Sequence, residues 1–214
     1  MTRPLVVVGA GGFGRETLDV IAALNAASDV PPFQVIGVID ANPSSANLSR
    51  LHALDVEYLG TEAEWFADGK TADFLVAIGS PSVRAAVTRS FLDAGFTAAT
   101  VVHPSAGIGA ATVIGSGSII CAGAQVSTNV QLGSHVHVNP NATVGHDTVV
   151  DDYVSINPAA TVSGDVTVHP GVLIGAGSVV LQGLVIGAGS TIGAAACVVR
   201  DVPAARTVKG VPAR

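Results

Sequence analysis

The chain has 214 residues and a mass of 21.2 kDa, which suits one large domain or two small ones. Charged residues make up 12% of the sequence, about half of the roughly 25% usual in a soluble domain, and the formal net charge is −6. This balance excludes a basic nucleic-acid-binding surface and a polybasic membrane patch. No apolar window approaches the ~20 residues of a membrane helix. Two cysteines make no disulfide framework, so we expect reduced thiols in a cytoplasmic protein.

Residues 1–100 predict a small parallel α/β domain. The apolar run at residues 5–8 predicts a strand, and a helix starting near Arg15 follows it. Ser80 and Pro81 are typical of a helix start, and Gly95 is typical of a helix end. Further strands are predicted at residues 35–39, 74–78 and 97–101. In such a domain the ligand binds at the carboxyl ends of the strands.

A glycine-rich segment with the pattern G-x-G-x-x-G follows the first strand. Glycines there allow the backbone to approach a pyrophosphate at a helix N-terminus. A tight turn without a ligand is one alternative, and a dinucleotide-dependent dehydrogenase is another, although ~100 residues leave no room for a substrate domain. We favour a sugar-nucleotide site, with the glycines on the diphosphate and Asp40 or the Gly79-Ser80 turn near the nucleoside. The predicted site residues are Gly9, Gly11, Gly12, Phe13, Gly14, Asp40, Gly79 and Ser80.

The second half of the chain carries an internal repeat of six residues. From residue 102 to residue 198, every sixth position is Val, Ile or Leu without a gap. These positions are Val102, Ile108, Ile114, Ile120, Val126, Leu132, Val138, Val144, Val150, Ile156, Val162, Val168, Ile174, Val180, Ile186, Ile192 and Val198. A period of six fits neither an α-helix nor a plain strand, whereas it fits short strands joined by corners in a parallel β-helix. Three such units make a coil of about 18 residues.

The repeat divides the chain into three predicted parts. Residues 1–100 form a Rossmann-like domain expected to bind a sugar nucleotide, and residues 101–199 form the β-helix domain. Residues 200–214 form a C-terminal capping tail. Because stacked repeats contact only their neighbours, both ends of the β-helix need covers, and we expect the N-terminal domain to cover one of them.

The hexapeptide pattern resembles the hexapeptide-repeat acyltransferases, whose β-helix is left-handed. The order of the two domains further resembles the sugar acetyltransferases grouped with sialic acid O-acetyltransferase, including the UDP-4-amino-sugar N-acetyltransferases of bacillosamine synthesis. The segments that carry this resemblance are Gly9-Ala10-Gly11-Gly12-Phe13-Gly14-Arg15-Glu16, Ile78-Gly79-Ser80, His103-Pro104-Ser105-Ala106, Gly145-His146-Asp147 and Gly210-Val211-Pro212-Ala213. The resemblance implies a homotrimer with active sites between neighbouring β-helices, acetyl-CoA along the helix groove and a nucleotide sugar on the N-terminal domain.

The resemblance also assigns the chemistry to His146 and Asp147. In that family the histidine of the Gly-His-Asp motif is the general base, and the following acid orients its ring. The acceptor amine, or hydroxyl, of the sugar would attack the thioester directly, because imidazole has a pKa near working pH and can take its proton. Asn139 matches a family asparagine seven residues before the base and is a candidate to position the acceptor; a plain coil-turn asparagine is the other reading.

The acyl-donor site departs from the family pattern at one position. Many relatives have a second histidine nine residues after the base, and Ser155 stands there in this chain. Its hydroxyl could donate a hydrogen bond to the thioester carbonyl but could not relay protons. The resemblance places acetyl-CoA along Ser155, Asn157, Gly164, Ala176 and Ala194. A second departure is Phe13, where the closest UDP-sugar enzymes carry a histidine, and this leaves the nucleotide open.

Two alternatives to an acetyltransferase remain at this stage. One is a zinc enzyme like the γ-carbonic anhydrases, since His135 and His137 alternate like neighbours on one strand face. That family's remaining ligand spacing is absent, so we expect no metal. The other is a non-catalytic structural or regulatory β-helix, against which the His146-Asp147 motif and the glycine loop argue. The sequence identifies neither the sugar nor the atom, nitrogen or oxygen, that is acetylated.

Overall fold

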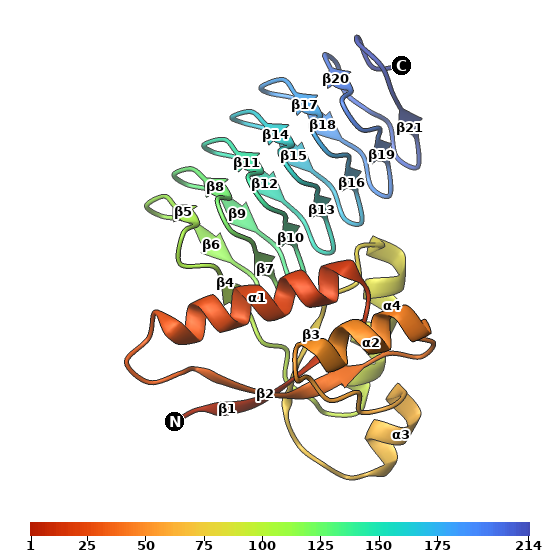
Figure 1. The fold of residues 1–214 in the computed structure, drawn as a ribbon. Helices are drawn as coiled ribbons and strands as arrows, with labels where there is room; N and C mark the ends of the chain where they lie inside the picture. Colours follow the sequence, from red (N-terminus) through yellow and green to blue (C-terminus); the bar gives the residue numbers. More distant parts are fainter.

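The computed structural model describes residues 1–214, and its first part is a small parallel sheet with helices around it (Figure 1). The sheet has three strands in the order β2-β1-β3. The elements of this N-terminal region are β1 (Arg3–Val8), α1 (Gly12–Ala26), β2 (Phe33–Ile39), α2 (Ser45–Ala53), α3 (Glu62–Ala67), β3 (Asp73–Val76) and α4 (Pro81–Asp93). The last four residues of β1 are buried, as expected for a parallel strand covered on both faces. None of the helices is long and apolar enough to cross a membrane.

The N-terminal region differs from the sequence prediction in two ways. The expected fourth strand at residues 97–101 is confirmed only in part: an isolated parallel bridge joins Ala98 to Phe74 of β3, and Val101 already belongs to the first strand of the β-helix. Two short helices, α2 and α3, follow β2; the first begins at Ser45, where the sequence of residues 42–45 and their neighbours predicts a loop. The second begins with a capping box, in which Thr61 and Glu64 satisfy each other's backbone N–H groups, and this Thr-x-x-Glu spacing was a readable signal.

The second part of the chain is a left-handed parallel β-helix with three flat faces (Figure 1). Neighbouring coils are in register at a spacing of 18 residues, as in the pairing of His137 with Ser155. The strands of the first face are β4 (Val101–Val102), β7 (Ile119–Ile120), β10 (His137–Val138), β13 (Ser155–Ile156), β16 (Leu173–Ile174), β19 (Thr191–Ile192) and β21 (Thr207–Val208).

The other two faces repeat this arrangement. The second face consists of β5 (Gly107–Ile108), β8 (Gln125–Val126), β11 (Thr143–Val144), β14 (Thr161–Val162), β17 (Val179–Val180) and β20 (Cys197–Val198). The third face consists of β6 (Val113–Ile114), β9 (Gln131–Leu132), β12 (Val149–Val150), β15 (Thr167–Val168) and β18 (Val185–Ile186). We call the turns from the first face to the second the first edge, those from the second to the third the second edge, and those from the third back to the first the third edge.

The core of the β-helix is aliphatic, as the six-residue period predicts. The period positions from Ile120 to Val198 are buried and belong to one cluster, together with small or branched residues at the corners such as Ala142 and Val154. Bulky rings would not fit inside so narrow a coil, which accounts for the aromatic content of only 4%.

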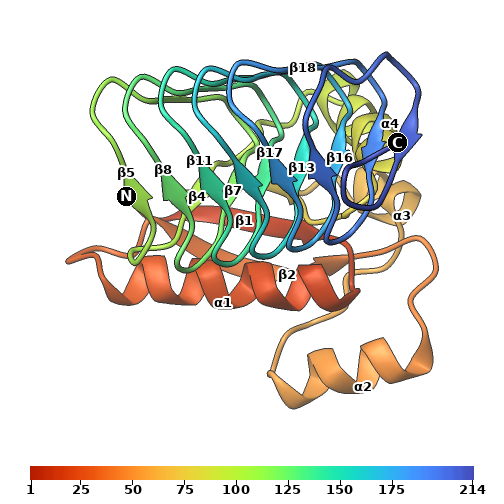
Figure 2. The ribbon, with the colours of Figure 1, turned by 90° about the horizontal axis from the view of Figure 1, so that it is seen from above.

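The N-terminal region lies along the first face of the β-helix, and not over its end as the sequence suggested. Helix α1 runs beside the stacked coils (Figure 2). The outward side chains of Val101, Ile119 and Cys121 pack in one cluster with Leu5 and Val7 of β1. This placement follows from the first two strands of the first face, β4 and β7, having apolar side chains on their outer side as well as their inner side. At the first coil, Ile108 remains 39% exposed.

The tail after residue 199 both extends and covers the β-helix. Val202 forms a bridge with Ile186, and β21 pairs with β19, so that the coil continues into the tail. Ala213 then turns back into the core cluster and is buried. The last coil is therefore shielded by the chain's own end.

Candidate active site

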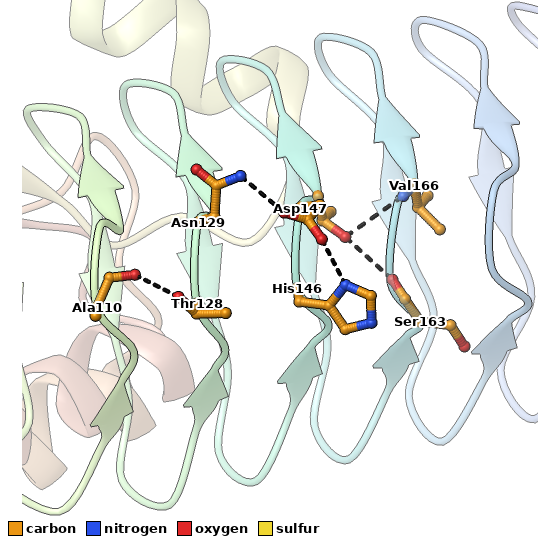
Figure 3. A network of polar contacts seen from close by, with 8 residues as sticks. Ala110, Thr128, Asn129, His146, Asp147, Ser163 and Val166 are labelled. Carbon is orange, nitrogen blue, oxygen red and sulfur yellow. Dashed lines mark hydrogen bonds and ion pairs between the residues drawn. The ribbon is translucent and has the colours of Figure 1, made fainter.

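The Gly145-His146-Asp147 motif forms a turn on the second edge, directly after β11 (Figure 3). The Nδ1 atom of His146 lies 2.7 Å from Oδ2 of Asp147, and both side chains are half exposed. Because a carboxylate can only accept, Nδ1 carries the hydrogen and Nε2 is left as the basic nitrogen. Nε2 makes no hydrogen bond within the chain. The geometry matches the roles that the resemblance implies for a base and its orienting acid.

Asp147 is held from both sides. Its Oδ1 accepts a hydrogen bond of 2.7 Å from the side-chain amide of Asn129, one coil earlier on the same edge (Figure 3). This bond, and next the bond to His146, hold the pKa of the Asp147 carboxyl below its usual value. The carboxylate therefore stays ionised, and it favours the tautomer of His146 that has a free Nε2.

Small residues leave space around the imidazole. Gly164 occupies the same edge one coil later, and a Cβ atom there would lie 2.6 Å from Cε1 and Nε2 of His146. An open groove of about 500 Å³ begins at His146 and runs over the second face, past Gly145, Ser127 and Gly109. The ring of His146 thus borders a surface hollow that a flexible molecule can enter.

The glycine loop forms at the carboxyl end of β1. Gly9 has a φ of +118°, and a Cβ at Gly14 would overlap the carbonyl oxygen of Gly9, so both positions need glycine for the fold itself. Gly11 and Gly12 have no such need: their φ values are not positive, and a Cβ there would meet no atom within 4 Å. They leave open space at the N-terminus of α1, where unpaired N–H groups favour an anion.

Asp40 holds this loop in shape. Its carboxylate accepts 2.7 Å and 2.9 Å hydrogen bonds from the backbone N–H groups of Ala10 and Asn42. Arg15 donates both to the carbonyl of Ala10 and to the side chain of Asn47 in α2. The structure therefore brings the predicted Asp40 to the glycine loop, with a role in fixing the loop's backbone.

The Gly79-Ser80 turn lies beside the glycine loop, at the end of β3. A Cβ at Gly9 would lie 2.9 Å from the carbonyl oxygen of Ala77, which places the two loops next to each other. Ser80 occupies the N-cap position of α4, but its hydroxyl contacts that of Ser82 at 3.3 Å and does not cap the helix as expected. The exposed Ser80 hydroxyl is thus left beside the predicted nucleotide site.

The expected role of Ser155 toward the thioester is wrong. Ser155 is 1% exposed, because the N-terminal region packs on it. Its hydroxyl donates to the carbonyl of Gly79 at 3.0 Å and accepts from Arg84 at 3.0 Å, so it has no hydrogen left for an acyl group. A position that would face a groove on an isolated β-helix is here part of the contact between the two regions.

The other predicted cofactor residues fall on different edges. Asn157 lies on the first edge beside Asn139, the candidate to position the acceptor, and the amide of Asn139 donates to Oδ1 of Asn157 at 3.1 Å. Ala176 and Ala194 continue the first edge through the next two coils and are exposed. Gly164 lies apart from them, on the second edge beside His146.

Within one chain, the predicted nucleotide-binding residues and the predicted catalytic residues form two groups that do not meet, and we call them the two half-sites. The glycine loop, Asp40 and the Gly79-Ser80 turn lie against the first face, whereas His146, Asp147 and Gly164 lie on the second edge, the edge opposite that face. Phe13 of the glycine loop is also on this side, because its ring centroid lies 4.7 Å from that of His137 on the first face. The basic Nε2 and the predicted nucleotide site are thus on different sides of the β-helix.

Comparison with known proteins identifies the class of enzyme. Residues 4–91 match the family model of the PglD N-terminal domain. A solved mutant of perosamine N-acetyltransferase from Caulobacter crescentus, in complex with CoA and GDP-perosamine, has a TM-score of 0.87 at 27% identity, over 99% of this chain and 95% of that chain. Over its whole length the chain is similar to hexapeptide-repeat nucleotide-sugar acetyltransferases. No curated protein sequence matches it.

Two further solved structures agree with this assignment. The acetyltransferase domain of PglB from Neisseria gonorrhoeae, in complex with acetyl coenzyme A, has a TM-score of 0.84 at 29% identity, over 100% of this chain and 99% of that chain. WeeI from Acinetobacter baumannii has a TM-score of 0.83 at 27% identity, with the same coverage. In each case the match spans both the N-terminal region and the β-helix of the acetyltransferase.

The two histidines considered for a zinc site, His135 and His137, lie in different elements of the β-helix and are both buried. His135 and His137 do not share a strand face: His135 is in a third-edge turn with φ +56°, and His137 is in β10. Burial, and then the nearby Arg84 charge, lower the pKa of His135 to about 4 and that of His137 well below 6.5. No group of three His, Cys, Asp or Glu side chains in the structure could hold a metal ion.

Two residues near the half-sites were missed by the sequence reading. Arg84 is one of them: the helix pattern of residues 81–93 gives no sign that its side chain is fully buried between α4 and the β-helix. It donates to the carbonyls of Ile78, His135 and Tyr153 at 2.7 to 3.0 Å, with no carboxylate partner. Asn129 went unnoticed too, although its spacing of 18 residues from Asp147 equals one coil and was a usable signal.

Proposed function

We propose that this acetyltransferase transfers the acetyl group of acetyl-CoA to an amino group of a nucleotide-activated sugar, with His146 as the general base. The observation that carries the proposal is the 2.7 Å contact between His146 Nδ1 and Asp147 Oδ2, which leaves Nε2 free at the rim of the groove. Relatives crystallised with CoA and GDP-perosamine, and with acetyl coenzyme A, support the choice of both substrates.

The chemistry requires one positioned base and no covalent intermediate. The amine nitrogen attacks the thioester carbonyl carbon and forms the amide bond, while the carbon–sulfur bond breaks and CoA leaves as a thiolate. Nε2 of His146 takes the proton from the attacking nitrogen and can return it to the leaving sulfur. Asp147 holds the ring and stabilises the imidazolium that forms. Cys121 is buried and lies in the first-face cluster, away from this motif.

The nucleotide sugar is bound by the N-terminal region in this proposal. The open positions at Gly11 and Gly12 admit the diphosphate to the N-terminus of α1, which favours negative charge. Asp40 fixes the loop, and the exposed hydroxyl of Ser80 is available to the rest of the ligand. The turn from β1 to α1 needs glycine only at Gly9 and Gly14. In this proposal, Gly11 and Gly12 are glycine because the ligand occupies the space beside them.

We further propose a homotrimer in which a second copy of the chain completes each site. The two half-sites of one chain lie on different sides of the β-helix, so His146 can reach a sugar only on a neighbouring chain. Apolar side chains on the outer second and third faces, such as Val179 and Val185, are 36% and 40% exposed and suit contact with another copy. CoA would then lie between two β-helices, along the second edge at Gly164 of one chain and the first edge at Ala176 and Ala194 of the next.

A thiol-release assay tests the proposal. UDP-, GDP-, TDP- and CMP-linked amino sugars, and their hydroxy counterparts, are each offered with acetyl-CoA, and product masses are recorded. Free thiol should appear only when acetyl-CoA and one class of amino sugar are both present, and the product should gain one acetyl group. Acetylation of hydroxy sugars alone would contradict the amine as acceptor, and no turnover with any sugar would favour a non-catalytic β-helix.

A further inference from the structure

Asn129 sits in the second-edge turn one coil before the His146-Asp147 pair. Its side-chain amide donates 2.7 Å to Oδ1 of Asp147, and Oδ2 of the same carboxylate contacts His146 at 2.7 Å (Figure 3). Each carboxylate oxygen thus has one strong partner. We propose that Asn129 is a positioning residue, which fixes His146 by fixing Asp147; this inference rests on the proposed function of His146.

The pair needs such a support because it is exposed. The side chains of His146 and Asp147 are 62% and 50% accessible, and an ion pair at that exposure contributes little order by itself. Asn129 is anchored by its own backbone, whose N–H donates to the carbonyl of Ala110 at 2.9 Å. The side-chain amide of Asn129 therefore links the backbone hydrogen bonds of the β-helix to the Asp147 carboxylate. Through that carboxylate it also restrains the imidazole of His146.

The turn itself does not require asparagine at this position. Asn129 has φ +56°, a left-handed conformation that asparagine adopts readily. One coil earlier, Ala111 adopts φ +58° at the same place on the second edge. Since alanine is accepted there, the amide of Asn129 has a role beyond the backbone, and its one side-chain contact is with Asp147.

The hydrogen bond also has an electrostatic consequence. The titratable groups around the carboxylate are His146 and, at the same turn position one coil later, Asp165. The hydrogen bond from the Asn129 amide stabilises the negative charge of the Asp147 carboxylate. The carboxylate therefore attracts the proton of a protonated His146 ring less strongly. Without the amide, the pKa of the Asp147 carboxyl would rise toward its usual value, and the carboxylate would hold the imidazolium proton more firmly.

The experiment compares Asn129→Ala and Asn129→Gly with Asn141→Ala in the trimeric enzyme. Asn141 has the same left-handed backbone, φ +58°, but lies on the first edge without contact to the pair. Both Asn129 variants should lower kcat roughly tenfold, as expected for losing a hydrogen bond to a charged group, with both KM values within about twofold. The acid limb of the kcat/KM profile should move to higher pH. Asn141→Ala should match the wild type.

The outcomes separate this inference from the proposed function. If Asn129→Ala keeps wild-type kcat and pH profile while His146→Ala is inactive, Asn129 has no positioning role and the base stands. If His146→Ala is itself active, the proposed function is wrong. A fall in kcat shared equally by Asn141→Ala would point to general loss of turn stability, and it would overturn the inference as well. Asn129→Gly guards against misfolding, because glycine adopts the turn without strain.

Discussion

The guanidinium of Arg84 donates a 3.0 Å hydrogen bond to the hydroxyl of Ser155, which joins α4 of the N-terminal region to β13 of the β-helix. The same hydroxyl donates to the carbonyl of Gly79, so the turn beside the glycine loop is fixed to the β-helix through two residues. Burial lowers the pKa of Arg84 to about 9, and it stays protonated near neutral pH with backbone carbonyls as its partners. This contact decides how the nucleotide half-site is placed on the β-helix.

Arg84→Met should strongly destabilise the protein. The substitution leaves the buried carbonyls of Ile78, His135 and Tyr153 without donors, and each unpaired group costs about 1–3 kcal/mol. We expect the free energy of unfolding to fall by roughly 3–5 kcal/mol. Urea denaturation at fixed protein concentration measures this. Arg89→Met, in the exposed part of the same helix, should change stability by less than about 0.5 kcal/mol; equal losses in the two variants would contradict this account.

His146→Ala should lower kcat by about 10²–10⁴-fold and change substrate binding little, because a general base acts in the transition state. Asp147→Asn should cost less, since it orients the ring without taking the proton. His169→Ala is a matched control: its Nδ1 lies 3.1 Å from Asp151 Oδ2, in a similar exposed pair on the third edge. Steady-state kinetics on all three variants, with mass spectrometry for an acetylated Cys121 or Cys197, decide the mechanism. An acetyl-cysteine on the reaction path contradicts direct transfer.

The two kinds of glycine in the loop should respond differently to substitution. Gly11→Val places a side chain in the open space at the start of α1, so the KM for the nucleotide sugar should rise while that for acetyl-CoA stays the same. Gly14→Ala should lower stability, because its Cβ overlaps the Gly9 carbonyl. Kinetics and thermal denaturation of both variants test this. Equal damage to both substrates in a folded Gly11→Val enzyme would mean that the loop is only a turn.

At a nucleotide-sugar concentration far below the KM of Gly11→Val, where Gly11→Val and His146→Ala are each nearly inactive alone, a mixture of the two should regain activity if the site lies between chains. His146→Ala keeps an intact glycine loop, and Gly11→Val keeps an intact base. In trimers reassembled from equal amounts, about a quarter of the sites pair an intact loop with an intact His146 from the next chain. Light scattering should also give three times the 21.2 kDa chain mass. Separately inactive variants that stay inactive when mixed, or a fully active monomer, would contradict the shared site.

Stability should fall as the pH drops from about 6.5 toward 4. Burial lowers the pKa of His135 to about 4, so the folded state stays neutral where the unfolded chain takes up a proton. The unfolded state then binds more protons, and unfolding is favoured by up to about 3 kcal/mol at pH 4, with no further loss from this group below that pH. Denaturant titrations between pH 7.5 and pH 4.5 measure the slope. His135→Phe keeps a ring beside Tyr153 and should reduce the slope, while the part due to His137, whose pKa is also lowered, remains; an unchanged slope would exclude His135 as a source.

The sequence alone determined the β-helix, because its faces repeat and each coil contacts only its neighbours. The aliphatic residue at every sixth position from Val102 to Val198 is enough to set the register, and the structure keeps it at 18 residues per coil. The His146-Asp147 contact was predictable for the same reason, since both residues share one turn. Local signals also gave α1, which follows the glycine loop, and α4, with its proline start and glycine stop.

The tertiary structure decided how the two regions meet. Ser155 looks like a groove residue in the repeat, and only the docking of the N-terminal region on the first face turns it into a buried partner of Arg84 and Gly79. That docking depends on side-chain packing between segments up to 76 residues apart, which no local pattern encodes. Asn129 is predictable only in part. Its position beside Asp147 follows from the 18-residue coil, whereas the orientation of its side-chain amide toward the carboxylate is set by the folded turn.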